Sequence, residues 1–438
     1  MPSLPGFLTA LKKKFKKEKK GARTGSAENI DDVEEPAAKN DKPERSGMAA
    51  VEESLRKKNK KKKGDAGTRQ HKTGGDMMNK TQDGGDGVPI TPPPPTKSVR
   101  TFERSGSRKK NKQSRELRSK MAKFKRPPKG DQQAMVEAFA RATCEKGING
   151  LRADFSRHER KYDMHKCTVF ARYPGKNRYK DVGCLDEQRV RLLNVGPENP
   201  DGYIHANYVA TLKAENRFIC TQAPLDSTCP DFWNMIMQEE VEIILMLCDF
   251  EERGQKKCAM YFPLAVDETK TFDAYQVTKT EEKDMEFVNE TKVKIRINTF
   301  RVQKGDKSHV CNQYIWLAWP DRGVPPADMA CIELLQKVSV TTKPIVVHCS
   351  AGIGRTGSVV LLQMILELFA DSRQFGDIEG LMLQMRKSRA CSVQNAAQYL
   401  FVHEVLLCYF RNQKLLASDQ KVFQDLTAAY YKAVEAAN

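Results

Sequence analysis

The chain has 438 residues and a formal net charge of +18, with 74 Lys and Arg against 56 Asp and Glu. This length allows one large domain with tails, or two to three domains of ordinary size. No run approaches the roughly 20 consecutive apolar residues that a membrane-spanning helix needs. The apolar stretch near the start follows no basic region and precedes no small-residue cleavage site. We therefore expect neither a membrane span nor a secretory signal.

Charge and cysteine content divide the chain at about residue 130. Residues 1–130 hold 35 Lys and Arg against 16 Asp and Glu, a net charge of +19, and no cysteine. All twelve cysteines lie between Cys144 and Cys408, singly and without a C-x-x-C pair. This spacing argues against a zinc ribbon and against a disulfide framework. We expect a reducing, cytoplasmic compartment, mostly buried cysteines, and neither a metal nor a cofactor.

Residues 1–130 are predicted to be a disordered basic tail, because they contain too few apolar residues to offset the entropy of ordering. Residues 4–15 place apolar side chains at helical spacing opposite lysines, which fits either a helix on an anionic membrane surface or a solvated tail. The lysine runs at 12–20 and 57–63 fit nuclear import, contacts to nucleic acid or an acidic partner, and no specific nucleic acid is predicted. The four prolines at 92–95 favour a stiff linker or an SH3 or WW ligand.

Beyond residue 130 the pattern is that of a folded domain, which we assign to 131–412. Val293, Ile295 and Ile297 alternate with charged residues, which is typical of a half-buried antiparallel strand. Strand-like runs come first and helical runs later, so the expected fold is α/β (α+β), with a mixed twisted sheet flanked by helices. Helices are predicted around 135–142 and over 327–340, 356–369, 378–386 and 396–410, and strands over 203–210, 217–221, 241–248, 273–279, 293–297 and 310–318.

Residues 413–438 are expected to form a separate C-terminal helix. Ser418 is a candidate cap for this helix. Its apolar residues would form a single stripe, which fits packing against the domain or binding to a partner. The stripe consists of Val422, Phe423, Leu426, Tyr430 and Val434.

The segment 344–358 carries the chemistry. An apolar strand over 345–347 leads into a glycine-rich turn and an apolar helix, so backbone N–H groups gather where an anion binds well. Cys349 lies at the mouth of this loop, in a positive field that favours the thiolate. Arg355 follows six residues later, and its planar guanidinium can hold two oxygens of a phosphoryl group. A thiolate that faces an anion-binding loop is arranged to attack phosphorus.

The full string is more specific than its cysteine and arginine alone. H-C-S-A-G-I-G-R-T-G, over 348–357, matches the signature H-C-x-A-G-x-G-R-[ST]-G of the protein tyrosine phosphatases at every fixed position. The resemblance covers roughly 139–411, with further motifs in the family's order. These are a substrate-recognition loop at 176–182, framework motifs at 218–224 and 258–263, a mobile acid loop at 319–325 and a glutamine loop at 385–399.

The resemblance to non-receptor members of this family implies hydrolysis of phosphotyrosine in proteins. Cys349 would attack the phosphorus and form a phosphocysteine, while Asp321 would act as general acid and then as general base. Arg355 and the loop amides would stabilise the phosphoryl oxygens. Thr356 would donate a hydrogen bond to the sulfur, and His348 would organise the loop.

Substrate contacts are also implied by the resemblance. Tyr179 would line a cleft that admits phosphotyrosine but is too deep for phosphoserine, and Asp181 would bind backbone amides of the substrate. Gln398, with Gln394, would position the attacking water. Glu252 either pairs with the loop arginine or is a surface carboxylate. The other implied substrate-binding residues are Ser350, Ala351, Gly352, Ile353, Gly354 and Lys257.

Two segments depart from the family's pattern. Residues 202–208 carry His205 where the common pattern has Asn, and residues 391–395 replace the common M-V-Q-T. These changes affect framework hydrogen bonds and the water site, but they remove no chemical group that the mechanism needs. The alternatives are a catalytically weak phosphotyrosine-binding pseudophosphatase, a dual-specificity phosphatase, and a scaffold that acts through its basic tail.

Overall fold

The computed structural model describes residues 132–158, 162–416 and 421–435. All of these residues belong to one compact unit. The predicted basic tail, with its lysine runs and prolines, lies outside the described residues, as does Ser418, so the interpretations of these segments stay predictions. Within the described ranges, no helix combines the length and the apolar character needed to cross a membrane.

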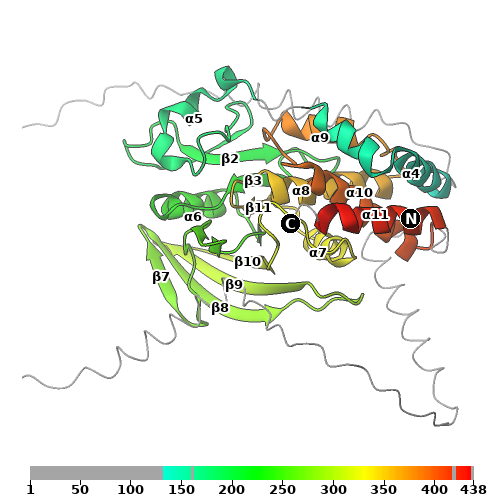
Figure 1. Ribbon diagram of the computed structural model, residues 1–438. Coiled ribbons are helices and arrows are strands. Elements are labelled where there is room, and N and C mark those ends of the chain that lie inside the picture. Colours follow the sequence, from blue (N-terminus) through cyan, green and yellow to red (C-terminus); the bar gives the residue numbers. More distant parts are fainter. Residues whose placement is uncertain (1–131, 159–161, 417–420, 436–438) are drawn as a thin grey trace, which may run out of the picture. The chain divides into compact units, whose positions relative to one another are not determined.

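A nine-stranded mixed sheet forms the centre of the fold (Figure 1), in the order β1-β2-β3-β11-β4-β10-β9-β8-β7. The pairs β3–β11, β11–β4 and β4–β10 are parallel, and the other pairs are antiparallel. A separate two-stranded hairpin is formed by β5 and β6. The strands are β1 (Arg189–Arg191), β2 (Tyr203–Val209), β3 (Phe218–Gln222), β4 (Ile243–Met246), β5 (Glu251–Glu252), β6 (Gln255–Lys256), β7 (Thr269–Phe272), β8 (Tyr275–Asp284), β9 (Lys294–Lys304), β10 (Lys307–Leu317) and β11 (Ile345–Cys349).

The helices cover the sheet. In Figure 1, α4, α7, α8, α9, α10 and α11 lie together on one side of the view, while α6 lies apart from them near β7. The first of these helices is kinked at Gly147, which has a φ of 57°. The helices are α4 (Gln132–Ser156), α5 (Thr168–Arg172), α6 (Cys229–Gln238), α7 (Ala330–Val338), α8 (Gly354–Ala370), α9 (Ile378–Arg386), α10 (Ala396–Asn412) and α11 (Lys421–Glu435).

The expected mixed sheet with helices in the C-terminal half is confirmed. Helices α5 and α6 and strands β1, β5, β6 and β7 were not predicted, and the ends of several predicted elements differ. The strand expected over 241–248 is shorter, because only Ile243–Met246 pairs within the sheet. The strand expected over 273–279 starts later and extends to Asp284 through its pairing with β9. The alternation of Val293, Ile295 and Ile297 does bury those side chains.

Strand β11 positions the functional loop. All five of its residues are buried, as expected for a strand covered on both faces, and its apolar run needs no alternation. It lies between the parallel strands β3 and β4 and leads directly into the loop before α8. In open sheets of this kind, ligands bind beyond the carboxyl ends of the parallel strands. Cys349, the last residue of β11, therefore lies where a ligand is expected.

Helix α11 packs against the domain, as one of the two interpretations of its apolar stripe predicted. Phe423, Leu426, Tyr430 and Val434 are buried, and the helix contacts α4 and α10. Polar contacts support the packing: Thr427 Oγ1 donates to Glu404 Oε1 over 2.7 Å, and Arg152 donates to the carbonyl of Ala433. Val422 is 51% exposed, so the stripe is narrower than the sequence pattern predicted.

The buried face of α11 supports a prediction about stability. Tyr430→Phe removes a buried hydroxyl with no hydrogen-bond partner among the described residues, so we expect the free energy of unfolding to stay constant or rise by up to about 1 kcal/mol. Leu426→Ala, on the same face, should lower it by about 2–5 kcal/mol because it leaves a cavity. Urea denaturation of the full chain measures both values. A large loss of stability in Tyr430→Phe would contradict the packing described.

Candidate active site

The loop between β11 and α8 wraps around the sulfur of Cys349. The side chain of Cys349 is 4% exposed, and the N–H of Gly352 donates to its Sγ over 3.2 Å. Gly352 has a φ of +69°, and a Cβ there would lie 2.0 Å from the carbonyl oxygen of Thr221. Both facts require glycine, because a side chain would be strained and would collide with β3.

Arg389 holds the outer side of this loop. Its guanidinium is fully buried and donates to the carbonyls of Gly352 and Ala351, each over 3.0 Å. It also donates to Asn207 Oδ1 over 2.9 Å and to His205 Nδ1 over 3.1 Å. Because these contacts hold carbonyl oxygens on the outer side, the N–H groups of the loop remain available on the side of the sulfur.

Arg355 is fixed by a bidentate ion pair with Glu252. The two bonds measure 2.5 and 2.6 Å, and Arg355 Nη1 also donates to the carbonyl of Leu247 over 2.7 Å. Burial acts to lower the pKa of Arg355, but the pairing with Glu252 outweighs it and raises the pKa, so the guanidinium stays charged. The interpretation of Glu252 as the partner of the loop arginine is thus confirmed, and the surface-carboxylate interpretation is wrong.

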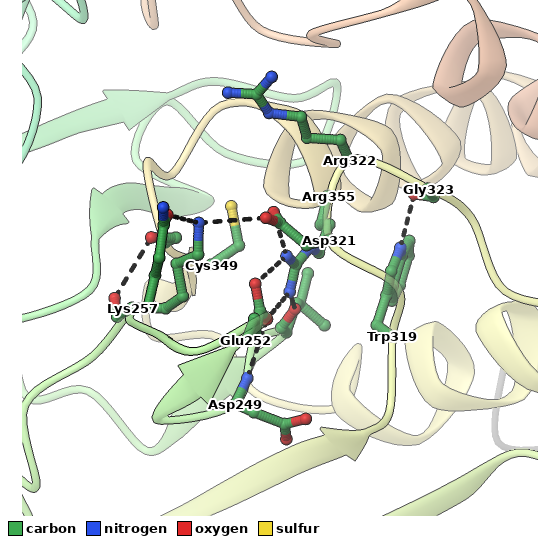
Figure 2. Close-up of polar contacts among 12 residues, drawn as sticks. Asp249, Glu252, Lys257, Trp319, Asp321, Arg322, Gly323, Cys349 and Arg355 are labelled. Carbon is green, nitrogen blue, oxygen red and sulfur yellow. Dashed lines mark hydrogen bonds and ion pairs between the residues drawn. The ribbon is translucent and has the colours of Figure 1, made fainter. Parts of the chain in front are cut away.

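Asp321 lies between two cations (Figure 2). Its Oδ1 accepts from Arg355 Nη2 over 3.0 Å, and its Oδ2 is 3.1 Å from Lys257 Nζ. Partial burial acts to raise the pKa of Asp321, but the hydrogen bond from Lys257 and the charge of Arg355 outweigh it and lower the pKa below its ordinary value. The carboxylate therefore pairs with the same two cations, Arg355 and Lys257, that would bind the oxygens of a phosphoryl ligand.

The acid loop around Asp321 is held at both ends. Trp319 is buried, its Nε1 donates to the carbonyl of Gly323 over 3.3 Å, and its ring packs against Trp316. Arg322 has a φ of 59°, a left-handed conformation that is uncommon outside glycine. Its carbonyl accepts a hydrogen bond from Asn395 Nδ2 over 2.6 Å. The loop thus contacts the glutamine loop directly.

The two glutamines lie against the start of α8. The backbone N–H of Gln394 donates to Gln398 Oε1 over 2.8 Å. A Cβ on Gly354 would lie 2.8 Å from Gln398 Nε2 and 3.0 Å from Gln394 Oε1. The missing side chain of Gly354 therefore leaves room for both amides beside the loop that follows Cys349.

His348 and His205 join the loops to the sheet as neutral rings. Burial lowers the pKa of each to about 3. His348 Nε2 shares a hydrogen bond of 2.7 Å with Tyr261, which accepts from Gln313 over 2.6 Å. His205 accepts from Arg389 at Nδ1, so its Nε2 carries the proton that it donates to the carbonyl of Val182 over 2.8 Å.

Tyr179 lies beside the loop, whereas Asp181 does not contact it. Tyr179 is half-buried, its hydroxyl shares a hydrogen bond of 2.8 Å with Ser350 Oγ, and its ring packs in a cluster that includes Ala351 and the buried side chain of Ile353. Asp181 is exposed at the end of the same segment. Its role in binding substrate amides stays a prediction.

The expected hydrogen bond from Thr356 to the sulfur is not formed. The hydroxyl of Thr356 is buried and has no partner among the described residues. The sulfur instead accepts from the N–H of Gly352.

Two contacts of the site were not predicted from the sequence, because each joins segments that lie far apart in the chain. They are Lys257 with Asp321 and Asn395 with Arg322. A motif search could have pointed to Asn395, since it lies in a segment that departs from the family's pattern.

Comparison with known proteins agrees with this geometry. The model of the family "Protein-tyrosine phosphatase" matches residues 173–408. Human "Tyrosine-protein phosphatase non-receptor type 9" is 33% identical over 303 residues, which cover 65% of this chain and 50% of that protein. Drosophila melanogaster "Tyrosine-protein phosphatase 69D" is 34% identical over 236 residues, which cover 53% of this chain and 16% of that protein. The chain thus spans half or less of the length of these curated relatives.

A solved structure has the same fold. The catalytic domain of human protein tyrosine phosphatase non-receptor type 18 superimposes with a TM-score of 0.53 and 28% identity, covering 64% of this chain and 100% of that one. The family model matches more than half of the chain, and the matched region contains Cys349, Arg355 and Asp321. The chain therefore belongs to the protein-tyrosine phosphatase family.

Proposed function

We propose that this chain hydrolyses phosphotyrosine in proteins through a phosphocysteine intermediate on Cys349, with Asp321 as general acid and base. One observation carries the proposal. Asp321 contacts Arg355 over 3.0 Å and Lys257 over 3.1 Å, and Arg355 lies in the first turn of the helix that follows the loop of Cys349. An acid, two cations and a nucleophile thus share one site.

A related structure supports the substrate class. It concerns PTPN18 and distinct HER2 tyrosine phosphorylation sites, and it matches this chain with a TM-score of 0.51 and 29% identity. Tyr179, which contacts Ser350 of the loop, supplies a ring against which a phosphotyrosine ring can pack.

In the first half of the reaction, the thiolate of Cys349 attacks phosphorus while the bond from phosphorus to the tyrosine oxygen breaks. Asp321 gives its proton to that oxygen, so tyrosine leaves as the neutral phenol. Arg355 and the loop N–H groups hold the equatorial oxygens, where charge accumulates in the transition state. The ion pair with Glu252 fixes the guanidinium in advance of the reaction.

In the second half, water attacks the phosphocysteine and the bond from phosphorus to sulfur breaks. Asp321, now ionised, takes a proton from that water, and inorganic phosphate and the thiolate of Cys349 are the products. Gln398 and Gln394 are the candidates to orient the water, since both amides border Gly354 at the start of α8.

The ligand-free charge of Asp321 is compatible with an acid role. Without ligand, Lys257 and Arg355 lower its pKa. A phosphoryl dianion that binds to Arg355 and Lys257 replaces Asp321 as the partner of both cations, and it adds negative charge beside the carboxyl. Both changes raise the pKa of Asp321, so we expect substrate binding itself to favour the protonated acid.

The central prediction concerns catalysis. Cys349→Ser should lower phosphate release from a phosphotyrosine peptide by at least about a thousandfold, because the nucleophile is lost. Asp321→Asn should lower it by about a hundredfold or more. Both are measured with the full chain and without added metal, beside the phosphoserine peptide, and Cys408→Ser, remote from the loop, is the control. Binding of the phosphotyrosine peptide to the intact chain without release would instead support the phosphotyrosine-binding pseudophosphatase.

Selectivity can be tested at Tyr179. Tyr179→Ala should raise KM for the phosphotyrosine peptide about tenfold, because an apolar contact with the substrate ring is lost. Tyr179→Phe keeps the ring and removes only the hydrogen bond to Ser350, so its KM should stay within about threefold of the original. Equal KM values for Tyr179→Ala and the unaltered chain would exclude a role of this ring in binding.

The pH dependence tests the pairing of Asp321. Because Lys257 lowers the pKa of Asp321, Lys257→Met should raise it. Acid catalysis needs the protonated carboxyl, so activity is lost as the pH rises through this pKa. The falling limb of kcat/KM against pH should therefore move to higher pH in Lys257→Met. Lys256→Met is the matched control, since Lys256 pairs with Asp226 and its loss should leave the limb unmoved.

A further inference from the structure

Asn395 makes two hydrogen bonds that join the acid loop to the first turn of α10. Its Oδ1 accepts from the backbone N–H of Gln398 over 2.9 Å, and its Nδ2 donates to the carbonyl of Arg322 over 2.6 Å. The two partners fix the orientation of the amide, because an N–H can bond only to the oxygen and a carbonyl only to the NH₂ group.

The first bond alone is ordinary. Asn395 has extended backbone dihedral angles, with a φ of −145°, and caps the N-terminus of α10. Aspartate and serine would cap the helix about as well, and threonine only somewhat less well. The second bond needs an N–H donor at the end of a side chain of this length, which none of these residues supplies. Threonine, the residue in the common family pattern M-V-Q-T, has a shorter side chain.

The acid loop needs such a contact. Arg322 adopts a left-handed conformation, and an ordinary residue stays in that conformation only when its surroundings hold it. Arg322 follows Asp321, and its side chain is exposed. Its carbonyl is therefore the point at which the strained part of the loop is attached to α10.

We infer that Asn395 is a positioning residue that holds the acid loop with Asp321 over the phosphate-binding loop. This inference rests on the proposed function. The side chain of Asn395 links the loop of Asp321, the proton donor of the first step, to helix α10. That helix carries Gln398, the candidate water-positioning residue of the second step. The acid loop and the glutamine loop are thereby held as a single arrangement.

The test compares substrates that differ in their need for an acid. A phosphotyrosine peptide needs a proton on its leaving oxygen, whereas difluoromethylumbelliferyl phosphate releases a stable anion. The parameter is kcat/KM, because it reports the steps up to departure of the leaving group and excludes the hydrolysis of phosphocysteine that both substrates share. All measurements use the full chain.

Two variants remove the donor and keep the cap. Asn395→Thr and Asn395→Asp should each lower the ratio of kcat/KM for the peptide to kcat/KM for the activated substrate about two- to tenfold, the effect of one hydrogen bond. The charge added by Asn395→Asp repels both phosphate dianions, so it largely cancels in the ratio. Asn412→Asp adds the same charge at an exposed residue paired with Asn289, and it should leave the ratio unchanged.

A double-mutant cycle separates positioning from general damage. In Asp321→Asn there is no acid to position. The double variant Asp321→Asn with Asn395→Thr should therefore have the same ratio of kcat/KM values as Asp321→Asn alone. An equal fall of both substrates in Asn395→Thr, or a further fall of the ratio in the double variant, would overturn the inference. If the unaltered chain releases phosphate from neither substrate, the proposed function fails first and the inference falls with it.

Discussion

The ion pair between Arg355 and Glu252 is the constraint on which the site depends. Burying two charges costs desolvation free energy, and an apolar pair would often be no less stable. The bidentate geometry nevertheless fixes the guanidinium at the start of α8, and the carbonyl of Leu247 adds a third contact. Arg355 Nη2 donates one N–H to Glu252, so its second N–H is available to a ligand oxygen. Without a ligand, this second N–H donates to Asp321. Arg355, Lys257, Glu252 and Asp321 then balance one another, two positive charges against two negative ones. On the proposed function, a phosphoryl dianion would upset this balance, and a proton on Asp321 would restore part of it.

Two neutral histidines, His348 and His205, connect the loops of the site to the sheet by hydrogen bonds. A protonated imidazole beside the loop would attract phosphate without orienting it, but burial keeps His348 and His205 neutral. His205 binds the cation of Arg389 on one side and the carbonyl of Val182 on the other. Through Arg389, it thereby connects the loop after Cys349 to segment 176–182, which contains Tyr179 and Asp181. The departure from the family's Asn at this position is accommodated by two good hydrogen bonds.

Features that depend on local sequence could be predicted, whereas features that depend on contacts between distant segments could not. The apolar run into a glycine-rich turn located β11, Cys349 and α8, because an anion-binding loop needs those residue types in that order. Strands β5 and β6 were not predicted, since each has two residues and a charged sequence without periodicity. The pairing of Glu252 was left open, and the contact between Lys257 and Asp321 was missed, because each depends on how segments about 60 to 100 residues apart meet in space. The unsatisfied hydroxyl of Thr356 is likewise a matter of orientation.

The distribution of backbone strain explains why the loops differ in their tolerance of substitution. Arg322 and Val393 adopt positive φ without being glycine, at 59° each, and Val393 is held there by its N–H bond to the carbonyl of Ile353. At these two positions the cost is dihedral strain, on the order of 1–3 kcal/mol per residue, and neighbouring contacts can offset it. At Gly352 a Cβ would also lie 2.0 Å from a backbone oxygen of β3, and no side-chain contact can offset an overlap of the Cβ with a backbone atom. The phosphate-binding loop must therefore keep its glycine, whereas the acid and glutamine loops can change residues provided that contacts such as that of Asn395 change with them.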